Sequence, residues 1–250
     1  HQQHGLGAPR MSSLFGAIQD LLFPPTCLGC TRRLDSSRPP LFCAVCLEQL
    51  EVIASPRCPC CGIPFATGVD HLCGDCLQQH YAFDCARSLV LYQPPVADII
   101  LRLKFGGQLS GLTTLAQLAG ISGCMQELAE PELIVPVPLH ASRLRERGFN
   151  QATLIARACL PQWVKRIRVD ALQRNRLTTP QSQLSGRQRR SNLQRVFSLK
   201  DWVKVQDKRI LVVDDVFTTG STVNECARVL RKAGAARIEV FTVARSLGGR

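Results

Sequence analysis

Two adjacent carboxylates and a short loop of hydroxyl residues are the part of this sequence best suited to chemistry. Asp214 and Asp215 follow an apolar run, and a small-residue loop comes shortly after them. The loop consists of Thr218, Thr219, Gly220, Ser221 and Thr222. In open α/β sheets ligands bind beyond the carboxyl ends of strands, and the N–H groups and dipole at a helix start attract anions. The loop therefore predicts a phosphate site, with Gly220 allowing close approach of the backbone.

The two carboxylates indicate what the rest of the ligand carries. Negative side chains repel a phosphate group, but they are suitable acceptors for a pair of hydroxyls, such as the 2′ and 3′ hydroxyls of a ribose. Together, Asp214, Asp215 and the loop predict a ribose 5-phosphate site. The alternative is a capped strand-to-helix turn without a ligand, and two acids followed by four hydroxyl residues argue against it.

Cysteines suited to binding metal are concentrated near the start of the chain. Nine of the thirteen cysteines lie between residues 27 and 76, and eight of them form four Cys-x-x-Cys pairs. The pairs are Cys27/Cys30, Cys43/Cys46, Cys58/Cys61 and Cys73/Cys76. A two-residue spacer lets both thiolates of a pair face one ion, and two pairs complete a tetrahedral sulfur shell. The pattern predicts about two structural zinc ions per chain in closed sites that leave no position open for chemistry.

Other interpretations of the cysteines are weaker. Disulfides are disfavoured because no secretory signal is present, and four pairs in succession argue against redox-active Cys-x-x-Cys motifs. Either neighbouring pairs or cross-braced pairs can share an ion, the former being simpler. Cys60 and His71 are alternative ligands in the third and fourth pairs. The other four cysteines are expected to be small buried residues; they are Cys85, Cys124, Cys159 and Cys226.

The positive charge of the chain is concentrated in one segment. The formal net charge is +12, and residues 141–200 contain 14 Lys and Arg against only Glu146 and Asp170. Such a field attracts phosphate groups, either in a small diphosphate or in a nucleic acid. A solvated basic face is the alternative, but few acids lie nearby to balance the charge.

The elements that must position these residues alternate between strands and helices. Apolar runs predict strands at 88–92, 133–137, 209–213 and 238–243. Helical spacing predicts helices at 96–103, 112–128, 150–160 and 221–233, the last ending at Gly234. This alternation predicts the fold class, an α/β domain with a parallel sheet.

Composition divides the chain into three parts. Residues 1–20 are expected to be a poorly ordered extension, 21–82 a small cysteine-rich zinc-ribbon unit, and 86–250 the α/β domain. With 45% hydrophobic and 20% charged residues the chain is typical of a globular protein. No stretch approaches the ~20 apolar residues of a membrane span, and no signal peptide pattern is present. We therefore expect a cytoplasmic location.

The stretch 210–222 resembles the phosphoribosyl diphosphate signature of type I phosphoribosyltransferases, with Phe217 bulkier than the usual aliphatic residue. The order of motifs along the chain is similar to that of the ComF family, especially its GntX-type members. These motifs are the cysteine pairs, Leu103-Lys104-Phe105, and the segments 135–140, 143–151, 179–184 and 187–192. The resemblance implies a double zinc ribbon before a phosphoribosyltransferase domain and a link to natural competence and use of external DNA.

The resemblance also implies roles for individual residues. Asp214 and Asp215 would bind the ribose hydroxyls of phosphoribosyl diphosphate with Mg²⁺, and the loop 218–222 its 5′-phosphate. The diphosphate would lie against a second loop and the helix that follows it, at Leu139, His140, Arg143 and Arg147. Residues 174–195 correspond to a mobile lid. Lys104 either points into the site or lies along the surface.

Three functions are consistent with these features. The first is a phosphoribosyltransferase whose acceptor the sequence does not identify, its acceptor-binding hood coming from residues 86–130 or the zinc-ribbon unit. The second is a non-catalytic sensor of phosphoribosyl diphosphate or a nucleotide. The third is an accessory protein that handles single-stranded DNA, with DNA-uptake or helicase proteins as partners. Aromatic residues are only 6% of the chain, so DNA binding would depend mainly on phosphate contacts and on salt.

Overall fold

The computed structural model describes residues 24–35, 39–106, 109–176 and 196–247. The expected N-terminal extension and nearly all of the expected lid lie outside these residues, as do the motifs at 179–184 and 187–192.

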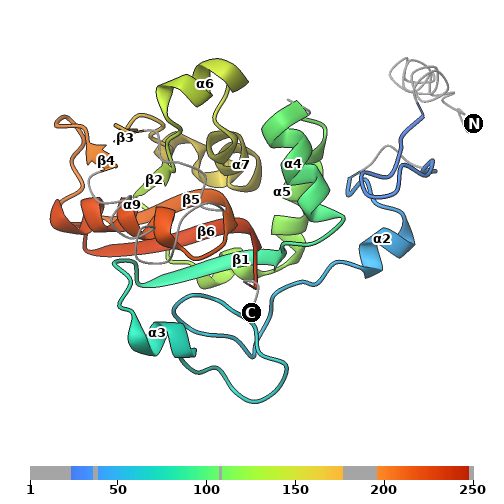
Figure 1. The fold of residues 1–250 in the computed structure, drawn as a ribbon, viewed down its shortest axis with the longest axis horizontal. Helices are drawn as coiled ribbons and strands as arrows, with labels where there is room; N and C mark the ends of the chain where they lie inside the picture. The colour runs from blue at the N-terminus through green and yellow to red at the C-terminus, as the bar shows by residue number, and fades with distance from the viewer. Residues whose placement is uncertain (1–23, 36–38, 107–108, 177–195, 248–250) are drawn as a thin grey trace, which may run out of the picture.

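A four-stranded parallel sheet forms the centre of the molecule (Figure 1). Its strands are β1 (Cys85–Leu91), β6 (Arg237–Arg245), β5 (Arg209–Phe217) and β2 (Leu133–Pro136), in that spatial order. The predicted parallel α/β fold is thus confirmed. Beyond β2, the short strands β3 (Leu172–Arg174) and β4 (Phe197–Leu199) form a separate antiparallel pair.

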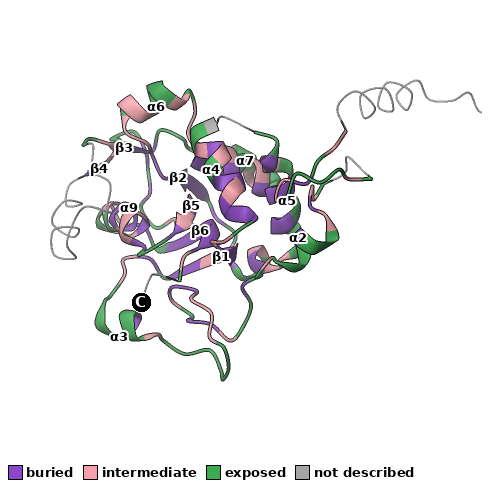
Figure 2. Cartoon of the chain, turned by 45° about the vertical axis from the view of Figure 1, so that its right-hand side comes forward, coloured by how far each residue is buried: buried purple, intermediate pink, exposed green. Residues whose placement is uncertain are grey.

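Helices cover both faces of the sheet. On one face pack α4 (Val96–Gly106), α5 (Gly111–Ile121) and α7 (Gln151–Cys159), and on the other packs α9 (Ser221–Lys232). The side chains of β5 alternate between the two cores, as the twofold period of a strand requires: Leu211 and Val213 contact the first, Ile210 and Val212 the second. Figure 2 shows the strands buried between these layers.

The two halves of the zinc-ribbon unit attach to opposite faces of the sheet. The half containing the short helix α2 (Ala44–Glu48) packs beside α4 and α5, and the half containing α3 (Gly74–Gln78) packs on the α9 face (Figure 1). Residues 51–53 join the halves and run antiparallel to β1. The N–H of Ile53 donates to the carbonyl of Leu89 at 2.9 Å. The unit therefore wraps around the free edge of the sheet.

Several of the observed elements differ from the expected ones. The helix expected over 112–128 ends at Ile121, because Gly123 adopts a left-handed φ of 68°, and a 3₁₀ turn, η1 (Cys124–Glu127), follows. Strand β5 continues beyond residue 213 to Phe217, so the acidic pair lies within the strand. A short helix, α6 (Ala141–Arg147), occupies the basic segment where no separate helix was expected, and a second 3₁₀ helix, η2 (Pro161–Arg166), follows α7.

Candidate functional site

The two predicted ligand loops lie side by side because the strands before them are neighbours. β2 and β5 pair in parallel, with Pro136 opposite Val213. The N–H of Val137 continues the ladder by donating to the carbonyl of Val213 at 2.8 Å. The loops that follow both strands therefore leave the same edge of the sheet, where ligands of α/β proteins bind.

The small-residue loop joins β5 to α9 as the sequence predicted. Gly220 is the N-cap of α9 and has a φ of 72°, a conformation that other residues rarely adopt. A Cβ atom at this position would lie 2.4 Å from Cζ of Phe217, so only glycine fits. Thr219 and Ser221 share a hydroxyl–hydroxyl hydrogen bond of 2.7 Å, while Thr218 and Thr219 face solvent. The loop thus presents hydroxyls and helix N–H groups at the edge of the sheet.

The acidic pair is more buried than its predicted role suggests. Asp215 is only 4% exposed, and its Oδ1 lies 3.0 Å from Nζ of Lys104 at the end of α4. Its buried Oδ2 makes no hydrogen bond to any described residue. Asp214 is half-buried, and its Oδ1 accepts a hydrogen bond from the N–H of Asp215 at 2.9 Å. Lys104, whose direction the sequence left open, therefore points into the site.

Burial and the neighbouring charge of Asp215 raise the pKa of Asp214 above its ordinary value, although Lys104 and Arg174 act in the opposite direction. Two close carboxylates in a partly desolvated site repel each other. Hydroxyl donors or a divalent cation would relieve that repulsion. The pair is consequently suited to a ligand that carries such groups, and its oxygens are donors of the hard type that Mg²⁺ prefers.

The second loop leads from β2 into α6. His140 is the N-cap of α6, and its Nδ1 accepts a hydrogen bond from the N–H of Ser142 at 3.2 Å. With Nδ1 accepting, a neutral imidazole carries its proton on Nε2, which remains available as a donor. Leu139 is half-buried in the same loop.

Two predicted diphosphate ligands, Arg143 and Arg147, lie on α6, and both are half-buried. Nη1 of Arg147 donates to Oε1 of Gln151 at 3.3 Å, and its guanidinium lies 5.3 Å from the ring centre of Phe105. Arg147 of α6 therefore lies beside the end of α4.

Sequence reasoning did not assign Arg174 or Phe105 to the site. Arg174 ends β3, which is bridged in parallel to His140, and its guanidinium lies 5.5 Å from the ring centre of Phe197. Burial and the charge of Arg143 lower the pKa of Arg174, and the charge of Asp214 opposes them. Phe105 is 76% exposed beside Lys104. The sequence grouped Arg174 with the expected lid, and no local pattern indicates that β3 lies beside the second loop.

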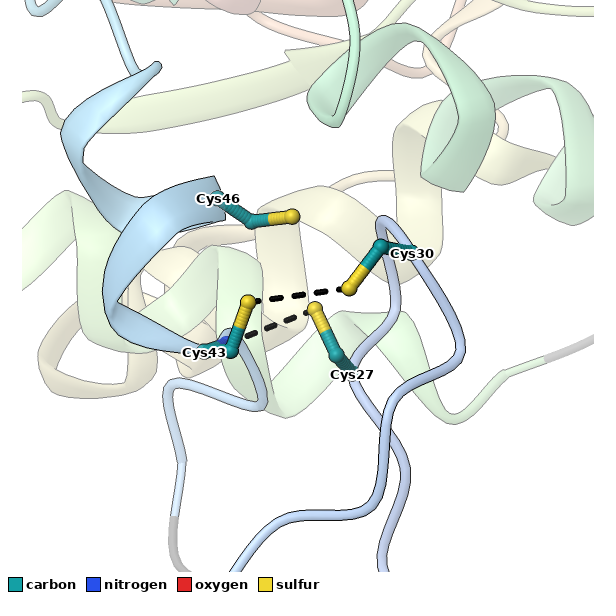
Figure 3. Close-up of side chains that lie close together, drawn as sticks. All are labelled: Cys27, Cys30, Cys43 and Cys46. Atoms are coloured by element: carbon teal, nitrogen blue, oxygen red, sulfur yellow. Dashed lines mark hydrogen bonds between the residues drawn. The ribbon is translucent and has the colours of Figure 1, made fainter.

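The cysteines form two clusters, each made by neighbouring pairs. Cys27, Cys30, Cys43 and Cys46 make one cluster, and Cys58, Cys61, Cys73 and Cys76 make the other. In each cluster all the Sγ atoms lie within 4.8 Å of one another. Figure 3 shows the side chains of the first cluster converging from a loop and the start of α2. A tetrahedral zinc–thiolate site places sulfurs about 3.8 Å apart, so both clusters fit structural zinc.

The two clusters share one hydrogen-bond pattern. The N–H of Cys43 donates to Sγ of Cys27 at 3.3 Å, and the N–H of Cys73 donates to Sγ of Cys58 at 3.5 Å. Burial alone would raise the pKa of Cys27 and Cys58, but backbone donors outweigh it and lower both values. Thiolates stabilised in this way are the form that binds metal.

The alternative ligands lie outside both clusters. Cys61, not Cys60, completes the second cluster, and His71 stacks on Phe65 with ring centres 4.0 Å apart. The remaining four cysteines are buried, as predicted.

Comparison with known proteins matches both parts of the chain. A double zinc ribbon domain model matches residues 18–77, and a phosphoribosyl transferase domain model matches residues 165–250. Competence protein F of Haemophilus influenzae is 34% identical over 226 residues, covering 88% of this chain and 96% of the relative. DNA utilization protein YhgH of Escherichia coli K12 is 35% identical, covering 82% of this chain and 91% of the relative. Competence protein ComFC of Bacillus subtilis is 28% identical, covering 82% and 84%. Within the described residues, no helix is long and apolar enough to cross a membrane.

Proposed function

The chain belongs to the ComF family, in which a double zinc ribbon precedes a phosphoribosyltransferase domain, and we propose that it binds phosphoribosyl diphosphate or a related nucleotide in a process that uses DNA. The names of its relatives, competence protein and DNA utilization protein, support that biological role. Cytoplasm is the proposed location.

One observation carries the proposal. The hydroxyl loop at the start of α9, the acidic pair near the end of β5, and the second loop with the basic helix α6 lie at one edge of one sheet. Each group matches a different part of the same ligand. The loop suits the 5′-phosphate, Asp214 and Asp215 suit the ribose hydroxyls, and His140 with the arginines of α6 suits a diphosphate at C1.

The residues of this chain would bind and orient the ligand rather than form a bond to it. Nε2 of His140 and the guanidinium groups of Arg143 and Arg147 would hold the diphosphate oxygens, and Asp214 would accept from the ribose. Magnesium bound with the ligand would neutralise part of the diphosphate charge. In a transfer, the bond between C1 and the diphosphate oxygen breaks and the diphosphate leaves, while the acceptor atom bonds to C1 and releases its proton to solvent.

The acceptor side of such a site would be formed by the end of α4. Lys104 contacts Asp215 there, and the exposed ring of Phe105 lies beside it. Of the two origins that the sequence left open for the hood, residues 86–130 and the zinc-ribbon unit, we propose the first.

Calorimetric titration of phosphoribosyl diphosphate with Mg²⁺ tests the proposal directly. Wild type is expected to bind, and Asp214→Asn is expected to weaken binding by about tenfold to a hundredfold, because a charged hydrogen bond to the ribose contributes about 1.5–3 kcal/mol. Asp201→Asn is the matched control, since it removes an exposed carboxylate outside the site. Absence of binding by folded, zinc-loaded wild type would rule the proposal out.

Handling of single-stranded DNA is a second candidate function, favoured by the basic segment 141–200. Affinity for an oligonucleotide such as oligo(dT) is expected to fall by about a factor of ten or more between 50 and 200 mM salt, because binding would rest on phosphate contacts. Fluorescence anisotropy measures this dependence. Asp214→Asn should leave it unchanged; affinity that is insensitive to salt would contradict the candidate.

A further inference from the structure

One buried arginine joins the second cysteine cluster to the sheet. Arg245, the last residue of β6, is 5% exposed. Its Nη1 donates to the carbonyl of Cys61 at 2.6 Å, and its Nη2 lies 3.3 Å from the Sγ of the same cysteine. Its guanidinium also lies over the ring of Phe217, 4.4 Å from the centre. A predicted metal ligand and the residue that ends β5 are thus held by the same side chain.

Phe217 extends this connection to the hydroxyl loop. Its ring is buried directly beneath Gly220, where a Cβ would come within 2.4 Å of it. The left-handed φ of Gly220 and this close contact leave the loop little room to change shape without movement of the ring. The position of Phe217 therefore determines where the N–H groups and hydroxyls of the loop lie.

The segment after α3 reaches the same loop by a second route. The hydroxyl of Tyr81 donates to the carbonyl of Thr219 at 3.2 Å, and the N–H of Ala82 donates to Oδ1 of Asn224 at 2.7 Å. Tyr81 also stacks on Phe83, and the Phe83 ring meets Phe217 edge-on at 6.0 Å. The segment that follows α3 consequently contacts the loop both directly, through Tyr81, and indirectly, through the ring of Phe217.

The first cluster has a comparable attachment to a different part of the molecule. Nη1 of Arg102 donates to the carbonyl of Leu28 at 3.1 Å, so an arginine of α4 holds the loop between Cys27 and Cys30. The N–H of Leu41 donates to Oγ1 of Thr114 on α5 at 3.0 Å. This half of the unit supports α4 and α5.

Charge makes Arg245 a suitable partner for a loaded cluster. A zinc ion with four thiolates carries a net charge of about −2, and a buried guanidinium needs nearby negative charge to offset its desolvation. The carbonyl and sulfur of Cys61 and the face of an aromatic ring are the partners that Arg245 contacts.

We infer that Arg245 is a positioning residue through which the second cysteine cluster holds the 218–222 loop in its anion-binding shape. The described contacts of the first cluster lead to α4 and α5 instead. The inference rests on the proposed function only for the identity of the ligand. The loop geometry that Arg245 maintains is a property of the protein without ligand.

Hydrogen exchange of the ligand-free, zinc-loaded protein tests the inference without requiring activity. In Arg245→Gln, peptides covering 217–224 are expected to exchange at least about tenfold faster, while those of β2 and α7 stay unchanged. Metal content should remain at about two zinc ions per chain. The affinity of Arg245→Gln for phosphoribosyl diphosphate with Mg²⁺ should fall by about tenfold. Arg245→Lys should recover only part of that affinity, because lysine lacks the planar fork of a guanidinium.

Arg102→Gln is the matched control, since it removes an equivalent arginine–carbonyl contact from the first cluster. Unchanged exchange at 217–224 in folded Arg245→Gln, or the same increase in Arg102→Gln, would overturn the inference. If Arg245→Gln does not fold, Arg245→Lys decides, because lysine keeps the charge but cannot hold the carbonyl and Sγ of Cys61 with a planar fork. Exchange at 217–224 that is unchanged in this variant would also overturn the inference. If peptides covering 217–224 exchange faster in Arg245→Gln but wild type does not bind phosphoribosyl diphosphate, the proposed function is disproved and the inference stands.

Discussion

Replacement of Cys76 by serine is expected to yield a protein with one zinc ion instead of two and with most of its folding free energy lost. Apparent binding free energies of structural zinc are on the order of 10 kcal/mol, which is comparable to the whole stability of a domain. Cys46→Ser should remove the other ion by the same argument, because Cys46 and Cys76 occupy equivalent positions in α2 and α3. Metal analysis after gel filtration and urea unfolding followed by circular dichroism measure both effects.

Cys60→Ser provides the control for both variants. Cys60 lies between Cys58 and Cys61 in the sequence, but its thiol is not one of the four that make up the second cluster. The Cys60→Ser variant should retain about two zinc ions per chain and a near-normal free energy of unfolding. Loss of an ion from Cys60→Ser, or retention of both by Cys76→Ser, would show that the ligand set is wrong.

Features governed by local chemistry could be predicted from the sequence. The two thiolates of a Cys-x-x-Cys pair are close along the chain, so the spacing of the pairs predicted, without a fold, the eight cysteines that gather in the two clusters. The hydroxyl loop and the acidic pair were likewise recognisable because a strand, a turn and a helix start follow one another within 210–222. Local spacing did not decide which pairs share an ion, since that depends on how the two halves of the unit fold.

Contacts between distant segments could not be read from the sequence. Lys104 meets Asp215 only because α4 packs over the end of β5, and Arg174 reaches His140 only because β3 lies beyond the edge of the sheet. Arg245 contacts Cys61 because the second half of the zinc-ribbon unit packs on the α9 face. A basic residue in the sequence carries no sign of the acid, ring or carbonyl it will meet, so these three roles required the packing of the whole chain.

Lys104→Met is expected to destabilise the protein by about 3–5 kcal/mol, because it leaves the buried carboxylate of Asp215 without its cation. Methionine fills a similar volume, so the lost charge rather than lost packing dominates. Asp215→Asn in the same background removes the unpaired charge and should restore most of the stability. Urea unfolding of wild type, both single variants and the double variant gives the interaction free energy directly.

Lys204→Met is the control for the loss of an exposed lysine and should change stability by less than about 0.5 kcal/mol. A double variant no more stable than Lys104→Met would mean that the pair is not the source of the effect.

Ligand binding by wild type, the two single variants and the double variant separates two roles for Lys104. A lysine that only neutralises Asp215 leaves the double variant with the ligand affinity of Asp215→Asn alone. If Lys104 also contacts the diphosphate, the double variant binds the ligand more weakly than Asp215→Asn does, because the diphosphate has then lost a cationic partner.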